Sequence, residues 1–343
     1  MKAVWFVCAI CALGCAALVV QAFEPPGQAA KAQASQQQAA QAQSAQPKSV
    51  SPQAESAPPP ESAKDASRII LDVTRVNMLF TVTDRKGRFI TDLGQNDFEV
   101  IENKKKQTIQ QFTAESELPL RLAVLIDTSN SIRERFRFEQ EAAVTFINGV
   151  VRRGTDKAMI VSFDSNAELV SDLTDEVTQL DKGIMGLRPG GGTAFYDAVY
   201  FASRDKLSKD QPRDKFRRAI IVVSDGEDNQ SRVTRDQALE MAQKADAVIY
   251  AISTNITHIE TEGDKVLRYL TTETGGQAFF PFKVEDLEQS FENIANELRH
   301  QYNIFYRPDP LKTDGLYHSV QLKVKDRKDL IVRARKGYYA PKL

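Results

Sequence analysis

The stretch L-A-V-L-I-D-T-S-N-S, residues 122–131, joins an apolar run to a group of small polar side chains. Its first five residues, Leu122–Ile126, are all apolar, which predicts a strand buried on both faces. Asp127, Ser129 and Ser131 follow that run, so we expect them on the loop at the carboxyl end of the strand. Two hydroxyl groups and a carboxylate therefore gather at one strand end.

Two further stretches bring oxygen-bearing side chains to the same region of the predicted sheet. Asp225 follows a second apolar run, Ala219–Val223, and Thr193 follows the glycine turn Gly190–Gly192. In open parallel sheets, ligands bind where strand ends meet at a switch in strand order. The side chains offer only oxygen atoms, a donor set that suits Mg²⁺ or Mn²⁺ rather than zinc.

Helix capping is the alternative explanation, because serine and aspartate are both favoured N-caps. Capping does not require five oxygen donors at three separate strand ends. We therefore predict a metal site, with no catalytic residue, whose ligands are Asp127, Ser129, Ser131, Thr193 and Asp225.

Strands and helices alternate from Arg121 onward, which is the pattern of a parallel sheet covered by helices on both faces. Besides the two runs above, strands are expected at Ala158–Phe163, Ala247–Ile252 and Gln277–Pro281. Helices are expected near Glu134–Val151, Glu176–Met185, Phe195–Ala202, Thr234–Lys244, Asp264–Thr274 and Val284–Gln301. The pair Gly275-Gly276 marks the carboxyl end of one of these helices.

Short strands flank this α/β region on both sides. On the amino-terminal side, residues 68–118, they are expected at Ile69–Val73, Val76–Thr83, Phe98–Glu102 and Thr108–Thr113. On the carboxyl-terminal side, residues 302–343, they are expected at Tyr302–Tyr306, Tyr317–Val324 and Leu330–Arg335. Each group is too small to bury a core alone. We therefore expect both groups to pair into one small β-sandwich beside a domain at residues 119–301.

Length and charge limit the classes of partner. A chain of 343 residues exceeds the usual single domain, which favours one large domain with accessory parts. Its 45 Lys and Arg residues against 46 Asp and Glu give a formal net charge of −1. No overall field therefore draws the chain to nucleic acid or to an anionic membrane, and we expect neither as a partner.

The amino terminus has the pattern of a secretory signal. Lys2 precedes an apolar run that ends in V-Q-A at residues 20–22, so we expect a signal at residues 1–22 and a secreted or periplasmic mature protein without a membrane segment. A retained membrane anchor and lipid attachment at Cys15 are the alternatives. All three cysteines lie in this leader, which leaves the mature chain without disulfides or thiolate sites. Residues 23–67 are rich in Ala, Gln, Ser and Pro, and predict a disordered linker.

The order D-x-S-x-S, then Thr, then Asp resembles the metal-ion-dependent adhesion site of von Willebrand factor A domains. The resemblance implies a Rossmann-like fold, which is a doubly wound and mainly parallel six-stranded sheet. D-F-E-V at residues 97–100 and R-K-G-Y-Y-A-P at residues 335–341 resemble a secreted bacterial family of A-domain-related proteins. The flanking strands further suggest that the A domain is an insertion, similar to the integrin A domain in its hybrid domain.

The resemblance also implies how such a site works. Ser129 and Ser131 would coordinate the ion directly, Thr193 in one state, and the two aspartates largely through water. A protein partner would complete the shell with an acidic side chain, so we expect a binding module and not an enzyme. The alternatives are a metal-dependent hydrolase, which needs a general base that the motif does not supply, and an assembly factor for an envelope complex.

Overall fold

A computed structural model describes residues 75–342 of the chain, except for residues 115–117, 134, 213–214, 256, 258, 282 and 284. The predicted signal at residues 1–22, the linker at residues 23–67, the strand at Ile69–Val73 and the three cysteines lie outside the described residues. Within this described part, no helix is long and apolar enough to cross a membrane.

A six-stranded sheet forms the centre of the α/β region. Its strands are β5 (Leu120–Asp127), β6 (Lys157–Phe163), β7 (Ala167–Thr174), β8 (Arg217–Ser224), β9 (Ala247–Ser253) and β10 (Ala278–Phe279). They lie in the order β10-β9-β8-β5-β6-β7. All neighbours are parallel except β7, which is antiparallel to β6. The predicted mainly parallel, doubly wound sheet is confirmed.

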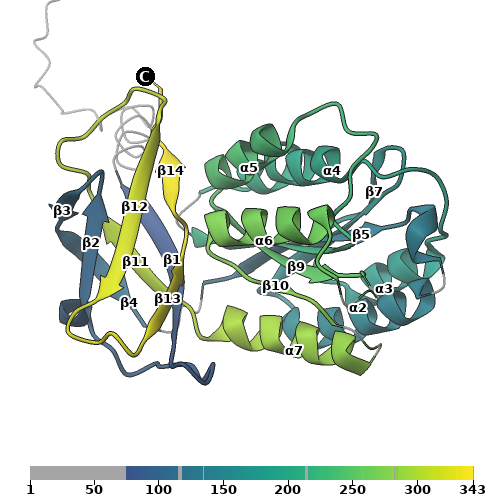
Figure 1. The fold of residues 1–343 in the computed structure, drawn as a ribbon, viewed down its shortest axis with the longest axis horizontal. Coiled ribbons are helices and arrows are strands. Elements are labelled where there is room, and N and C mark those ends of the chain that lie inside the picture. The colour runs from purple at the N-terminus through teal and green to yellow at the C-terminus, as the bar shows by residue number, and fades with distance from the viewer. Residues whose placement is uncertain are drawn as a thin grey trace, which may run out of the picture. The chain divides into compact units, whose positions relative to one another are not determined.

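Helices cover both faces of this sheet, as Figure 1 shows. Three of them pack on one face: α2 (Phe136–Val150), α3 (Val177–Gly186) and α7 (Glu285–Arg299). Three others pack on the opposite face: α4 (Phe195–Phe201), α5 (Arg235–Lys244) and α6 (Glu262–Thr274). Shorter helical turns are η1 (Gln95–Asp97), η2 (Asn130–Ile132), the π-helical η3 (Ala202–Lys206) and η4 (Leu207–Lys209).

Local sequence explains where two of these helices begin and end. Thr234 and Thr261 each accept a hydrogen bond from the third residue of the helix that follows, in a capping box. Gly275 ends α6 in the left-handed conformation, with φ +90°, which glycine adopts without steric cost. The predicted glycine terminus is therefore confirmed.

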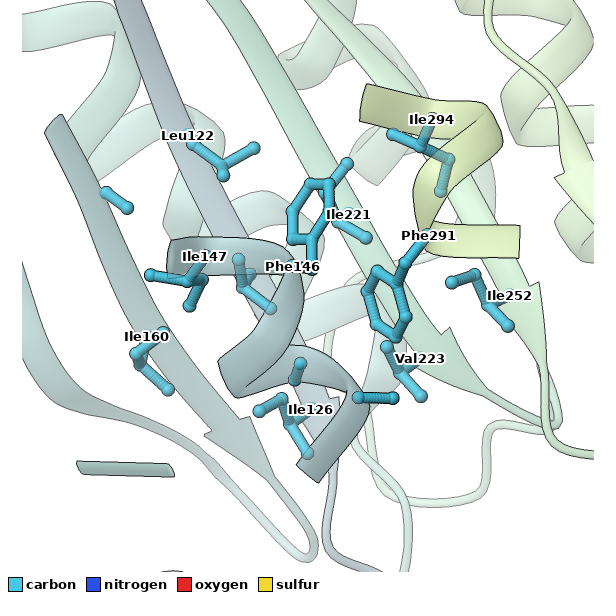
Figure 2. Packing of buried hydrophobic residues seen from close by; sticks show 14 of the residues in the cluster. Leu122, Ile126, Phe146, Ile147, Ile160, Ile221, Val223, Ile252, Phe291 and Ile294 are labelled. Carbon is cyan, nitrogen blue, oxygen red and sulfur yellow. The ribbon is translucent and has the colours of Figure 1, made fainter. Parts of the chain in front are cut away.

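The apolar runs of the parallel strands face helices on both sides. On the face that Figure 2 shows, Ile126, Ile221 and Val223 of the sheet meet Phe146 of α2 and Phe291 of α7. The two phenylalanine rings lie 5.0 Å apart, centre to centre. This packing holds α2 and α7 against the strands whose carboxyl ends carry the predicted ligands.

Strands from both flanks pair with each other outside the α/β region. From the amino-terminal side come β1 (Val76–Thr83), β2 (Phe98–Glu102), β3 (Lys105–Gln107) and β4 (Ile109–Thr113). From the carboxyl-terminal side come β11 (Tyr302–Tyr306), β12 (Tyr317–Val324), β13 (Ile331–Ala334) and β14 (Gly337–Tyr339). They form two four-stranded sheets in the orders β13-β1-β11-β4 and β14-β12-β2-β3. Both sheets mix the two flanks, as the sequence predicts.

One apolar cluster lies between these two sheets. Met78 and Phe80 of β1, Val100 of β2 and Ile304 of β11 are all buried in it. The cluster draws on both ends of the described chain, so neither flank completes a core without the other. We call this eight-stranded unit the sandwich.

Ion pairs join the sandwich to the α/β region. Glu297 of α7 is 1% exposed and accepts hydrogen bonds from Arg333 of β13, at 3.3 and 3.2 Å, and from Thr81 of β1, at 3.1 Å. Arg335, just after β13, pairs with Asp246 at 2.6 Å. Buried contacts of this kind fix one geometry, because a displaced partner leaves a charge without compensation.

Three strands were not predicted. β7 lies at the edge of the large sheet, and its sequence A-E-L-V-S-D-L-T mixes apolar and polar residues without an apolar run. β3 and β14 are three residues each, which is too short for periodicity to show.

Candidate metal centre

The predicted site lies where the strand order of the large sheet reverses. From β5 the chain proceeds outward through β6 and β7, then returns to β8 and continues outward through β9 and β10. β5 and β8 are parallel neighbours, with Ile126 opposite Val223. Asp127 is the last residue of β5, whereas the sequence predicted it as the first residue of the loop. Asp225 directly follows β8, as predicted. Both therefore lie at the switch point, where such sheets bind ligands.

Asp127 is held rigidly at the base of the site. Its side chain is fully buried, and one carboxylate oxygen, Oδ1, accepts a hydrogen bond from the amide of Ser129 at 2.8 Å. The other, Oδ2, accepts one from the hydroxyl of Ser224 at 2.7 Å. Both oxygens are therefore oriented before any ligand arrives.

A chain of oxygen atoms leads from the interior to the surface. The hydroxyl oxygens of Ser129 and Ser131 lie 2.9 Å apart, and the Ser131 hydroxyl donates to Oδ2 of Asp225 at 3.1 Å. Ser129 is buried, Asp225 is partly exposed and Ser131 is exposed. The structure thus brings four of the five predicted side chains together.

Thr193 reaches this group through its loop. The amide of Gly190 donates to the carbonyl oxygen of Thr128 at 2.6 Å, and the side-chain amide of Asn130 donates to the carbonyl oxygen of Gly191 at 3.2 Å. The amide of Thr193 donates to Oδ1 of Asn229 at 3.0 Å. The buried Thr193 hydroxyl is therefore on a loop fixed beside the Thr128–Asn130 turn, although no hydrogen bond in the described part links it to the other four.

Close approach explains the glycines of this loop. Gly191 has φ +78°, a conformation that other residues adopt only with strain. A Cβ at Gly192 would lie 2.8 Å from Oδ1 of Asn229, the atom that holds Thr193. The glycine turn is therefore needed to seat Thr193, and is more than a plain connection.

Two supporting residues carry no signal in the sequence. Ser224 orients Asp127 from the neighbouring strand, and Asn130 contacts a loop that is 61 positions away in the chain. Both contacts depend on the order of strands in the sheet. Asp228, in contrast, receives the amide of Tyr196 in the first turn of α4 and acts as a cap.

The donor geometry fits a small divalent cation. Oxygen ligands at about 2.0–2.1 Å from Mg²⁺ lie about 3.0 Å apart when they occupy adjacent octahedral positions. The observed separations of 2.9 and 3.1 Å along the Ser129, Ser131 and Asp225 oxygens match that spacing. Among the described residues, no three His, Cys, Asp or Glu side chains gather as a metal site, so the hydroxyls would be required ligands.

Electrostatics also favours a cation at this position. The pKa of Asp127 is raised to about 6, because burial and the nearby charge of Asp225 outweigh the hydrogen bonds from Ser129 and Ser224 that lower it. A positive ion among these carboxylates would offset the cost of keeping Asp127 ionised.

Comparison with known proteins agrees with the fold. Residues 122–227 match the von Willebrand factor type A domain family, and this segment carries all five predicted ligands. The chain therefore contains a von Willebrand factor type A domain. We use the name A domain for the whole α/β region, from the start of β5 at Leu120 to the end of α7 at Arg299. No protein of curated function matches the chain.

Several solved structures resemble the chain weakly. A von Willebrand factor type A protein from Catenulispora acidiphila is 15% identical, with a TM-score of 0.46, and the match covers 73% of this chain and 75% of that one. Proximal thread matrix protein 1 from the mussel byssus, with a zinc-occupied MIDAS motif, is 14% identical, with a TM-score of 0.47 and coverage of 57% and 49%. The PilB minor pilin from Streptococcus sanguinis is 13% identical, with a TM-score of 0.43 and coverage of 54% and 62%. The chain thus spans less than two thirds of that pilin, and the assignment depends on the family match, not on these likenesses.

Proposed function

We propose that the A domain binds Mg²⁺ or Mn²⁺ through Asp127, Ser129, Ser131, Thr193 and Asp225, and uses the ion to hold an acidic side chain of a protein partner. The observation that carries this proposal is the oxygen chain at the sheet's switch point, which runs from buried Ser129 to exposed Ser131 and partly exposed Asp225. Its spacing suits an octahedral ion, and its outer end is open to a partner.

The donor set explains why an acidic partner suits the site. Hydroxyl ligands are neutral, so a dication held mainly by Ser and Thr keeps more positive charge than one in a cage of carboxylates. When bound, the ion supplies an electrophilic position for one further oxygen ligand. Asp127 stays fixed by Ser129 and Ser224 while that ligand is captured, because both of its oxygens already accept hydrogen bonds.

Calorimetric titration of Mg²⁺ into the full chain tests the metal site. We expect Ser131→Ala and Thr193→Ala to weaken Mg²⁺ binding by about tenfold or more, since even changes around the ligands of metal sites cost that much. Ser208→Ala is the matched control, because its hydroxyl donates to the carbonyl oxygen of Arg204, away from the site. Equal affinity in all four proteins would show that the motif match is coincidental.

Paired peptide arrays test the partner class. Peptides that differ only by glutamate or glutamine are probed with wild type in Mg²⁺ and in chelator. Metal-dependent binding of the glutamate member alone supports an adhesion role. Turnover of a phosphoester or peptide substrate that is lost in Asp225→Ala would instead establish a metal-dependent hydrolase.

We also infer that the protein is exported, with residues 1–22 as its signal, which would bring the site to partners in the envelope or outside the cell. The motivation is the Lys2-led apolar run that ends in V-Q-A at residues 20–22. Intact mass of the exported protein should begin at Phe23. A species that retains the leader, or one acylated at Cys15, would contradict this.

A further inference from the structure

Glu139, in the first turn of α2, is a buried carboxyl group without a hydrogen-bond partner among the described residues. It is 1% exposed, and both of its carboxylate oxygens are buried and unpaired. Buried polar groups almost always have partners, so an exception of this size needs an explanation. Its neighbour Gln140, also buried, donates a hydrogen bond to the carbonyl oxygen of Ile184.

The charges that act on Glu139 belong largely to the candidate metal site. Asp127 at the end of β5 and Asp225 after β8 both repel an ionised Glu139, whereas Arg135 at the start of α2 attracts it. Arg135 is itself engaged elsewhere, since its guanidinium donates to the carbonyl oxygen of Thr254 at 2.9 Å. Two of the three charges therefore disfavour ionisation of Glu139.

These surroundings keep a proton on Glu139 at neutral pH. Burial raises its pKa from an ordinary 4.5 to about 8, with Asp127 and Asp225 adding to the shift and Arg135 opposing it. A dication bound by Asp127 and Asp225 would cancel their two negative charges, and so would remove the repulsion that they exert on an ionised Glu139. The preference of Glu139 for its neutral form then weakens.

We propose that Glu139 links cation binding to pH: it keeps a proton while the two aspartates lack a cation, and it loses that proton to solvent when a divalent cation binds them. This inference rests on the proposed metal site. The exchange balances as one cation bound for one proton released, with no change in oxidation state. By thermodynamic reciprocity, a proton on Glu139 lowers the affinity for the cation by the same factor by which the bound cation lowers the affinity of Glu139 for the proton.

The direction of the pH effect follows from this exchange. Below about pH 8 the cation-free protein holds the proton, so each bound cation must displace it. Cation affinity should therefore rise with pH, by up to about tenfold per pH unit for one full proton, and level off above pH 8.

Proton release can be counted directly. Mg²⁺ is titrated into the full chain at pH 7.5 in HEPES and in Tris, whose ionisation enthalpies differ, and the difference in heat gives the protons released per ion. We expect measurable proton release for wild type and almost none for Glu139→Gln, because only the repulsion from Asp127 and Asp225 is removed while Glu139 stays buried. Glu141→Gln is the matched control, because Glu141 lies on the same helix but is exposed and paired with Arg137 at 3.0 Å.

The outcomes separate this inference from the proposed function. If wild type does not bind Mg²⁺ or Mn²⁺, both are wrong. If wild type binds Mg²⁺ but releases no proton, or if Glu139→Gln releases as many, only the role of Glu139 is wrong. Should Glu139→Gln fail to fold by circular dichroism, the wild-type affinity between pH 7 and 8.5 decides alone, and a flat profile overturns the inference.

Discussion

Replacement of Gly263 by alanine should displace Asp225 without replacing any of the five proposed ligands. Gly263 is the second residue of α6, and a Cβ there would lie 2.2 Å from the carbonyl oxygen of Asp225 and 2.9 Å from the amide nitrogen of Glu227. Real Cβ atoms essentially never approach below 3.0 Å. Both obstacles are backbone, so the helix and the loop that carries Asp225 must separate.

The expected cost is the balance of two opposing effects. Alanine is better than glycine inside a helix by about 1 kcal/mol, whereas overpacking of a tight contact costs about 1–3 kcal/mol. A rigid backbone contact belongs at the upper end, so we expect Gly263→Ala to lower the free energy of unfolding by about 1–2 kcal/mol. Because the displaced loop carries Asp225, Mg²⁺ binding should weaken by about tenfold.

Gly149→Ala is the matched control, because the same substitution at this position should stabilise the protein. Gly149 lies in α2, and a Cβ there meets nothing within 4 Å. We expect this variant to gain about 0.5–1 kcal/mol and to bind Mg²⁺ as wild type does. Urea unfolding followed by far-ultraviolet circular dichroism measures stability, and calorimetry measures binding. The reasoning is refuted if Gly263→Ala is as stable as Gly149→Ala, or if it binds Mg²⁺ normally.

Two other substitutions test contacts away from the site. Arg333→Ala leaves Glu297 buried without its ion pair and should cost about 3 kcal/mol in urea unfolding. Arg327→Ala breaks an exposed pair and should cost much less. Similar losses in the two variants would contradict the role of burial. Asp156 is 2% exposed; burial raises its pKa, but hydrogen bonds from Arg152 and from main-chain amides outweigh that effect and hold it below the ordinary 3.8. A carboxyl group with a depressed pKa stabilises the fold above its unfolded-state pKa, and this stabilisation is lost as pH falls through the folded-state pKa. Asp156→Asn should therefore cost about 1–3 kcal/mol at pH 7 and progressively less below pH 4. A stability difference between the two proteins that does not change with pH would rule this out.

The sequence predicts the ligand positions because they depend on local order along the chain. An apolar run such as Leu122–Ile126 shows a buried strand, and a polar residue directly after it must lie near that strand's end. The same logic found β8 and Asp225, and a glycine turn pointed to Thr193. The position of a residue can be predicted in this way when it depends only on one strand and the loop that follows it.

Residues that act across the sheet are not accessible in this way. Ser224 contacts Asp127 only because β8 lies beside β5. Glu139 is subject to the charges of Asp127 and Asp225 only because α2 packs on the face of the sheet. On a helix with alternating charged and apolar residues, a glutamate at position 139 would be expected to be exposed. Its burial depends on the tertiary arrangement, which no local pattern contains.

The chain leaves the sandwich to form the A domain and then returns to it, and the two strands at these points are paired with each other. β4, the last strand before it, is antiparallel to β11, the first strand after it, and Thr113 lies opposite Asn303. A chain that turned directly from one to the other would form an ordinary β-hairpin. The entire A domain therefore occupies the position of a hairpin loop, so an ancestral sandwich could acquire it, exchange it or lose it without rearranging either sheet.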